Sequence, residues 1–162
     1  MRARLVAAGI TAAAAGIGFL GTKPDSAWYR SLDKPAWQPP AVAFPLVWTP
    51  LYGLIGWGTG RALDKAGPDG GRMLALTTAD LALNAGWCWA FFVRQSPATG
   101  LGVIVALDVV NVALVREAAK HDLTAALALK PYAVWSGFAT ALNASIWWRN
   151  RVGHSAISGP HP

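Results

Sequence analysis

The chain has 162 residues, of which 54% are hydrophobic and only 14% are charged, and its mean hydropathy is +0.34. A soluble domain usually carries about 25% charged residues, so the composition excludes an ordinary water-soluble enzyme and indicates membrane helices. The net charge of +6 comes from 14 Lys and Arg residues that are scattered in ones and twos between apolar runs. No nucleic-acid partner is expected, because that function needs a basic stripe, and these cations suit the headgroups of a lipid bilayer.

The first apolar run, Leu5–Leu20, follows Arg2 and Arg4. A basic start before an Ala-rich stretch is also typical of a secretory signal peptide. The run is long for a signal core, however, and Asp25 occupies the third position before the only plausible cleavage point, after Ala27, where a small neutral residue is expected. The sequence therefore favours a first membrane span that is retained.

A polar, proline-rich loop at residues 22–43 precedes four further apolar runs, at residues 44–63, 73–93, 98–115 and 123–148. A helix needs about 20 apolar residues to cross a bilayer, and none of the runs shows the polar stripe of a water-facing helix. The sequence therefore predicts an all-α integral membrane bundle of five transmembrane helices, with spans at about 5–20 and at these four runs. This domain covers residues 1–152, and a disordered tail is expected at 153–162. Lys and Arg divide almost evenly between the two sides, so no orientation is predicted.

Several of the runs contain polar side chains at membrane depth, where each costs about 2 to 3 kcal/mol on insertion scales. The spacing of Asp80, Asn84 and Trp87 places them on one face of a helix. Asp108 and Asn111 are spaced in the same way. Such groups either form hydrogen bonds between helices or line a pocket. Both interpretations stay open for Asp108 and Asn111, whereas Asn84 beside Trp87 favours a pocket.

Nine tryptophans are many for a chain of this length. About half of them suit the interfacial belt of a membrane protein, as Trp147 and Trp148 do beside Arg149. Trp48 and Trp135 lie further inside their runs. Residues on the same helical faces are Tyr52 and Ile55 for Trp48, and Phe138, Ala139 and Leu142 for Trp135. Flat aromatic walls with a few amides indicate a site for a large, flat, apolar ligand.

Small residues at helical spacing indicate that helices approach closely. Gly56 and Gly60 form a G-x-x-x-G motif, and Ala12 and Gly16 have the same spacing. Such motifs pack helices within a chain or between chains. We therefore expect a homodimer.

No metal site or catalytic arrangement can be assembled from the sequence. Cys88 is the single cysteine, so an intrachain disulfide is excluded. His121, His154 and His161 fall in a loop or in the tail, away from any span, so none is placed to ligate haem iron. Metal-site spacings, phosphate loops and Ser-His-Asp arrangements are not found. We expect no required cofactor.

Two segments, Trp28–Pro40 and Phe44–Tyr52, read together resemble a long family signature. It is the W-Y-x-x-L-x-K-P-x-W-x-P-P-x-x-x-F-P-x-V-W-x-x-L-Y signature of the translocator protein family, also called TspO/MBR or the peripheral-type benzodiazepine receptor family. Further matches are Leu81–Asn84 with Trp87, and Pro131–Asn143. The chain thus resembles a bacterial-type member over nearly its whole length.

This resemblance implies a usually dimeric five-helix membrane bundle whose first loop lids a pocket for porphyrins such as protoporphyrin IX. For animal members of the family, the resemblance also implies binding of cholesterol and of synthetic ligands. Trp48 and Trp135 match tryptophans implicated in light-dependent porphyrin breakdown, and would be the catalytic residues if that reaction occurs. The other matched pocket positions are Trp28, Phe44, Asn84, Trp87, Ala139 and Leu142. The family's sterol motif is broken, because Ala144 stands where a Tyr is expected before Arg149.

The leading hypothesis is a binding or sensing protein for a metal-free tetrapyrrole. A photo-oxidoreductase that uses the same pocket is a second hypothesis. A transporter of porphyrin, sterol or another small amphipathic molecule, with Asp80 and Asp108 on a polar path, is the alternative from another class.

Overall fold

The computed structural model describes residues 2–151, and within this range it contains helices and no strands. The α-helices are α1 (Arg2–Gly21), α2 (Ala27–Ser31), α3 (Ala43–Ala66), α4 (Gly71–Cys88), α5 (Pro97–His121) and α6 (Leu123–Arg151). A 3₁₀ turn (Gly67–Asp69) links α3 to α4, and a π-helical turn (Trp89–Val93) continues α4. The tail expected at 153–162 lies outside the described residues, as do His154 and His161.

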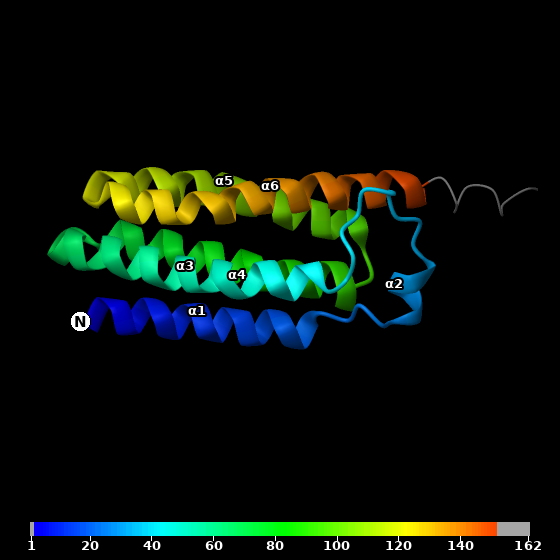
Figure 1. Cartoon of the computed structure of the whole chain (residues 1–162), viewed down its shortest axis with the longest axis horizontal. Coiled ribbons are helices and arrows are strands. Elements are labelled where there is room, and N and C mark those ends of the chain that lie inside the picture. The colour runs from blue at the N-terminus through cyan, green and yellow to red at the C-terminus, as the bar shows by residue number, and fades with distance from the viewer. Residues whose placement is uncertain (1, 152–162) are drawn as a thin grey trace, which may run out of the picture.

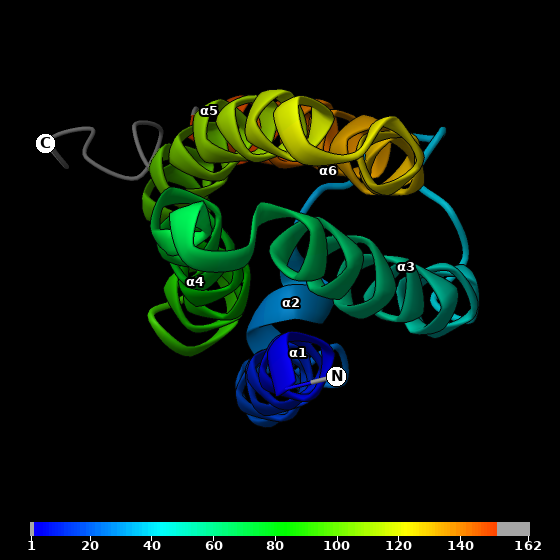
Figure 2. The ribbon, with the colours of Figure 1, turned by 90° about the vertical axis from the view of Figure 1, so that its left-hand side faces the viewer.

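The long helices α1, α3, α4, α5 and α6 run along a common axis and form a closed ring (Figures 1 and 2). Around the ring the order is α1, α3, α6, α5, α4, and α4 packs back against α1. Figure 2 shows this ring end-on. One end of the ring, which we call the lid end, is covered by α2 and the loop that follows it. We call the opposite end the ion-paired end, because Arg4 pairs with Asp64 there and Arg61 with Asp122.

The helices extend beyond several of the predicted spans. The charged stretch 116–121, which lies between two of the predicted spans, forms the last turns of α5, so His121 is helical. The only residue between α5 and α6 is Asp122, which begins α6 because its Oδ1 accepts a hydrogen bond from the Ala125 N–H at 2.8 Å. The loop predicted at 22–43 contains the short helix α2, where the Ser26 side chain accepts from the Tyr29 N–H.

The first helix belongs to the bundle, as expected for a retained span. Its buried face contains Ala7, Thr11, Ala14 and Gly18. Gly60 provides space for this helix, because a Cβ on Gly60 would lie 3.0 Å from the Arg4 Cα. The predicted G-x-x-x-G of α3 thus packs helices within one chain. Ala12 and Gly16 instead point outward, and the homodimer stays a prediction.

Two helices, α1 and α5, are long and apolar enough to span a membrane by length and composition alone. In each of them less than a third of the most apolar stretch is buried inside the bundle. Large apolar side chains therefore point outward, among them Phe19 at 80% exposure and Val109 at 67%. Five membrane crossings remain a prediction at this point.

Candidate ligand cavity

A cavity of about 590 Å³ lies inside the ring, in the half next to the lid end. This volume is within the range of small-molecule sites in proteins. Eight of the sequence-predicted pocket residues line it, namely Phe44, Trp48, Tyr52, Asn84, Trp87, Trp135, Ala139 and Leu142. They come from α3, α4 and α6, so the ring brings together residues up to 98 positions apart in the sequence.

The walls of the cavity are aromatic. On one side, Trp48 lies 5.4 Å from Tyr52 and 6.1 Å from Tyr132, measured between ring centroids. On the α6 side, the ring of Trp135 contacts Phe44 at 6.2 Å. Rings in these tilted and edge-on arrangements support one another and leave flat faces for a ligand to pack on.

The floor of the cavity is polar, and its side chains form a chain of successive hydrogen bonds. The Tyr52 hydroxyl donates to Asn84 Oδ1 at 2.8 Å, and Asn84 Nδ2 donates to the Tyr132 hydroxyl oxygen at 3.2 Å. Tyr132 in turn donates to Asp80 Oδ2 at 2.9 Å. Asp80 is fully buried and does not line the cavity, so it lies beneath the floor. Because each bond fixes the next, the Asn84 amide is held in one orientation.

Asn143 of α6 joins three helices at the side of the cavity. Its Oδ1 accepts from the Trp87 indole N–H at 2.9 Å, and its Nδ2 donates to the Pro97 carbonyl at 2.7 Å. Asn143 therefore links α6 to α4 and to the start of α5.

Asp108 has a similar role between α5 and α6, because Ser136 and Thr140 both donate to its carboxylate at 2.6 Å. Of the two interpretations for Asp108, this geometry favours contact between helices. Asn111 is buried with no hydrogen-bond partner in the described part of the chain.

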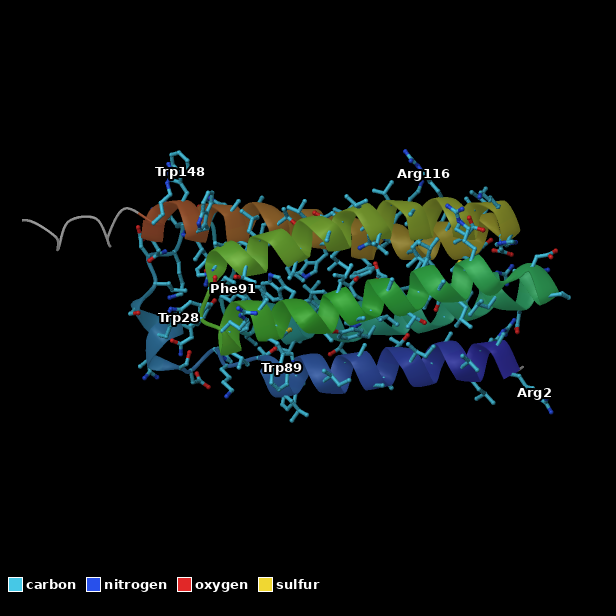
Figure 3. All side chains as sticks on the ribbon, turned by 180° about the vertical axis from the view of Figure 1, so that it is seen from behind. Arg2, Trp28, Trp89, Phe91, Arg116 and Trp148 are labelled. Atoms are coloured by element: carbon cyan, nitrogen blue, oxygen red, sulfur yellow. The ribbon has the colours of Figure 1, made fainter. Side chains whose placement is uncertain are left out.

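Two predicted pocket residues lie outside the cavity lining. Trp28 of α2 packs edge-on against Phe91 at 5.6 Å, at the lid end of the bundle (Figure 3). Phe138 lies behind Trp135, with ring centroids 5.1 Å apart. Both residues therefore support the walls rather than form them.

The π-helical turn supplies wall residues that sequence reasoning missed. Its defining hydrogen bond runs from the Arg94 N–H to the Trp89 carbonyl at 2.9 Å. Phe91 and Phe92 lie in this turn, are buried and line the cavity. Turns of this kind are often found at functional sites. Cys88, Ile104 and Leu107 were also missed, since an apolar residue in an apolar run gives no signal of its own.

The lid is fastened to α6 at its far end. The Asp33 N–H donates to Asn150 Oδ1, and Asn150 Nδ2 donates to the Asp33 carbonyl, both at 2.9 Å. Arg149 adds an ion pair with the Asp33 carboxylate at 3.4 Å. Inside the lid, the Gln38 amide donates to the Tyr29 hydroxyl, and burial raises the pKa of Tyr29. These contacts hold the loop over the mouth of the cavity.

The described residues contain no group of three or more His, Cys, Asp or Glu side chains that could hold a metal ion. His121 lies at the ion-paired end, with Nε2 3.5 Å from Glu117 Oε1. The cavity offers aromatic faces and a small number of fixed polar groups, such as the Asn84 amide, to a ligand.

Comparison with known proteins identifies the family. The chain is 38% identical to the Tryptophan-rich protein TspO of Chlorobaculum tepidum over 140 residues, which cover 80% of this chain and 86% of that protein. It is 37% identical to the Tryptophan-rich sensory protein of Cereibacter sphaeroides over 121 residues, 75% of each chain. It is 33% identical to the Translocator protein of Bos taurus over 148 residues, 85% of this chain and 86% of that protein. The model of the TspO/MBR family matches residues 6–149, and this membrane helical protein belongs to the TspO/MBR family.

Proposed function

We propose that this protein crosses the membrane several times and binds a flat tetrapyrrole, such as protoporphyrin IX, inside its helical bundle. The observation that carries the proposal is the cavity of about 590 Å³, whose lining includes Trp48, Trp135 and Asn84. Indole faces pack well on a flat aromatic ring, and a fixed amide orients it. No cofactor is required, because the porphyrin is the ligand.

The distribution of polarity supports five membrane crossings. The 20 residues of α1 rise about 1.5 Å each and so reach about the 30 Å of a hydrocarbon core. Apolar side chains such as Phe19 and Val134 point outward, whereas Asp80 and Asn143 are buried in the ring. The reverse arrangement is expected of a bundle in water. In a bacterium the cell membrane is the expected location.

The polarity of the cavity suits an amphiphilic ring. Its walls are mostly aromatic above the polar floor at Asn84, whereas Thr22, Tyr29 and Gln38 line it near the lid. A tetrapyrrole carries its carboxylates along one edge, so we place that edge toward the lid and the bare ring between the indoles. This orientation leaves charged groups at the wet end of the site, where their desolvation costs least.

Binding or sensing is favoured over transport through the bundle. Beneath the polar floor, Met73, Leu114 and Leu129 are fully buried, so a tightly packed core separates the cavity from the ion-paired end. The names of the relatives suggest both functions, since one is called a sensory protein and another a translocator protein. Transport of a porphyrin, sterol or other amphipathic molecule remains the alternative, and it requires this core to open.

Fluorescence titration tests the proposal. Purified protein in lipid nanodiscs is titrated with protoporphyrin IX, and we expect saturable quenching of tryptophan emission. Trp48→Phe and Trp135→Phe should each weaken binding by about tenfold, because each removes part of a buried aromatic contact. The control is Trp148→Phe, since Trp148 is 58% exposed on the outside of α6 (Figure 3). Quenching that does not saturate would refute the proposal. So would parent-like binding by both Trp48→Phe and Trp135→Phe.

Light-dependent oxidation of the bound porphyrin is a second candidate function. Its specific support is that Trp48 and Trp135 both line the cavity and so would lie beside the excited ring. Dioxygen would be the oxidant, and the ligand would carry the difficult chemistry. Illumination of the complex should then deplete porphyrin faster in the parent than in Trp135→Phe. Equal depletion in both leaves simple binding.

A further inference from the structure

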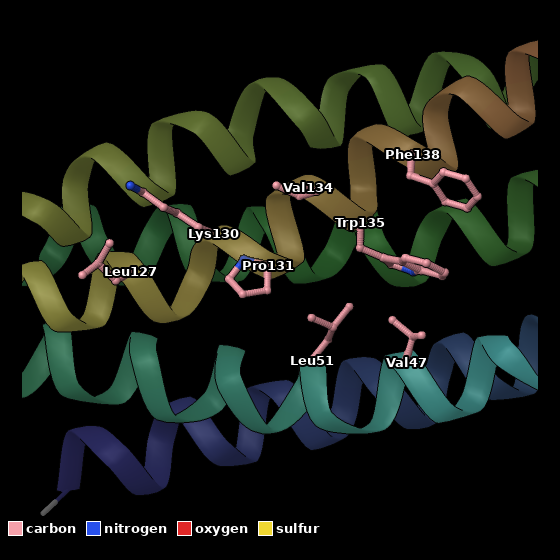
Figure 4. Close-up of a pocket in the computed structure, with 8 residues that line it drawn as sticks. All are labelled: Val47, Leu51, Leu127, Lys130, Pro131, Val134, Trp135 and Phe138. Carbon is pink, nitrogen blue, oxygen red and sulfur yellow. The ribbon is translucent and has the colours of Figure 1, made fainter.

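A second concavity, of about 710 Å³, lies on the outside of the ring between α3 and α6 (Figure 4). Its walls are apolar and include Val47 and Leu51 of α3 and Val134 of α6. Lys130 is the only charged residue that lines it, and no carboxylate of the described residues lies within ion-pair distance of Lys130. We call this concavity the outer groove. It combines an apolar surface with one unpaired cation.

Trp135 is the wall between the outer groove and the inner cavity, because it lines both. Its indole N–H is buried and has no hydrogen-bond partner in the described part of the chain. Of the other indoles that line the cavity, Trp87 is anchored, since its N–H donates to Asn143 Oδ1 at 2.9 Å. The Trp135 ring is therefore held by packing alone and can change rotamer without losing a hydrogen bond.

The seam between α3 and α6 is tight at one end and formed by side chains at the other. Toward the ion-paired end, a Cβ on Gly58 would lie 3.2 Å from the Ala125 carbonyl oxygen, so the two backbones touch. Toward the lid end, the seam contains the ring pair of Phe44 and Trp135, with centroids 6.2 Å apart. Side chains rearrange far more easily than a packed backbone, so this half of the seam is the part that can open.

Both walls of the seam contain a proline within the helix, Pro50 in α3 and Pro131 in α6. A proline has no N–H to donate and its ring clashes with the preceding turn, so each helix lacks one backbone hydrogen bond there. The lid-end segments of α3 and α6 can therefore bend away from each other at these points. Pro131 itself lines the outer groove.

We propose that the outer groove is a docking site for the carboxylate-bearing ligand, which then moves from the membrane into the cavity between α3 and α6, past Trp135. The apolar walls contact the flat ring, and Lys130 pairs with a carboxylate at the end of the groove away from Trp135. The ring therefore turns in its plane as it enters, before its carboxylates face the lid. This inference rests on the proposed function and names the route to the same cavity. The alternative route leads under the lid.

The groove route gives a kinetic signature. Porphyrin-loaded vesicles are mixed with protein in nanodiscs, and tryptophan quenching is followed by stopped flow. Lys130→Gln should slow association of protoporphyrin IX by about tenfold, because Lys130 attracts the docked anion. Dissociation should slow by the same factor, since the ligand in the cavity does not touch Lys130 and the equilibrium affinity is unchanged. The neutral dimethyl ester of the porphyrin should show no change.

Further variants complete the test. Arg116→Gln removes the same charge from α5, where the side chain points away from the bundle (Figure 3), and should leave the rates unchanged. Val134→Trp fills the groove and should slow association and dissociation of both the porphyrin and its dimethyl ester.

The outcomes separate the two routes. If the parent binds porphyrin but Lys130→Gln and Val134→Trp keep both rates within about twofold, the groove route is wrong. Faster association in Asn150→Ala together with unchanged groove variants would establish the route under the lid. Failure of the parent to bind would refute the proposed function instead.

Discussion

Charged side chains connect the helices at the ion-paired end, whereas aromatic rings and amides connect them at the lid end. Arg4 pairs with Asp64 between α1 and α3, and Arg61 pairs with Asp122 between α3 and the start of α6, at 2.9 Å. Glu117 of α5 accepts from Lys120 at 2.8 Å and lies 3.1 Å from Arg72 of α4. The hydrogen bond from Lys120 holds the pKa of Glu117 below its ordinary range.

The contrast extends to how closely the backbones approach. Gly58 and Gly60 bring α3 against α6 and α1 near the ion-paired end. Near the lid end the corresponding space between helices is the cavity, lined by rings such as Trp48 and Phe91. The bundle thus separates two tasks, since one end fixes the order of the helices and the other leaves room for a ligand. Variants at the first end should change stability, and variants at the second should change binding.

The sharpest test of this separation is Gly58→Leu. Its side chain would meet the Ala125 carbonyl and Leu129 Cγ, the latter 3.3 Å from the new Cβ, so α3 and α6 must move apart. We expect the free energy of unfolding in detergent to fall by about 3 kcal/mol. A thermal melt followed by circular dichroism measures the effect. Gly53→Leu is the matched control, because nothing lies within 4 Å of a Cβ at Gly53 in the same helix. Equal losses in the two variants would contradict a tight seam at Gly58.

Asn84→Leu tests the opposite end. The variant removes the hydrogen bonds to Tyr52 and Tyr132, and leaves the Tyr132 hydroxyl bonded to Asp80. Hydrogen bonds between membrane helices contribute about 0.6 to 1.7 kcal/mol each, so stability should fall by about 1 to 2 kcal/mol. Porphyrin affinity should fall by about tenfold as the oriented amide is lost. Asn111→Leu is the control, because Asn111 is buried on α5, does not line the cavity and has no hydrogen-bond partner among the described residues. A normal affinity in Asn84→Leu would show that the polar floor does not contact the ligand.

Much of this architecture could be predicted from the sequence, because lipid imposes a simple rule on composition. Uninterrupted apolar runs predicted the long helices, and the aromatic signature predicted that Trp48 and Trp135 belong to one site. The ends of the helices were harder to predict from the sequence. Charged residues at 116–121 look like a loop when a membrane span is assumed to stop at the first charge. They nevertheless continue α5, where Glu117 pairs with Lys120 and with Arg72 of α4.

The remaining features depend on contacts between distant segments. The π-helical turn that places Phe91 and Phe92 inside depends on packing against the lid, where Tyr29 lies 5.2 Å from Phe92. The connection of Asn150 to Asp33 spans 117 residues and has no local pattern. Trp28 was predicted as a pocket residue because it matches the family pattern, and Phe138 because it shares a helical face with Trp135. Neither signal distinguishes a wall of the cavity from its support.

Asn150→Ala tests how firmly the lid closes the cavity. The variant removes two hydrogen bonds to the Asp33 backbone and leaves the Arg149 ion pair. Exposed bonds of this kind contribute about 1 kcal/mol together, so the lid should open more often while the helices stay intact. Hydrogen exchange of the amides in residues 27–38 should speed up by about fivefold. Exchange within α3 should not change, and an increase there would show that the lid stabilises the whole bundle.

The smallest effect is expected for the pH dependence of the ion-paired end. The hydrogen bond from Arg61 lowers the pKa of Asp122, which lies outside the predicted spans. A lowered pKa in the folded state means that Asp122 contributes stability above its unfolded pKa, and that this stability is lost as the pH falls through the folded pKa. Melting temperature should therefore decrease between pH 6 and pH 3, and Asp122→Asn should reduce this decrease, because Asn still begins α6 but carries no charge to lose.

Asp69→Asn is the control. It makes the same charge change in the turn before α4, where no ion pair of the described residues involves Asp69, and it should melt like the parent at every pH. A parallel shift of the whole curve in Asp122→Asn would mean that its loss of stability comes from the helix start and not from the charge.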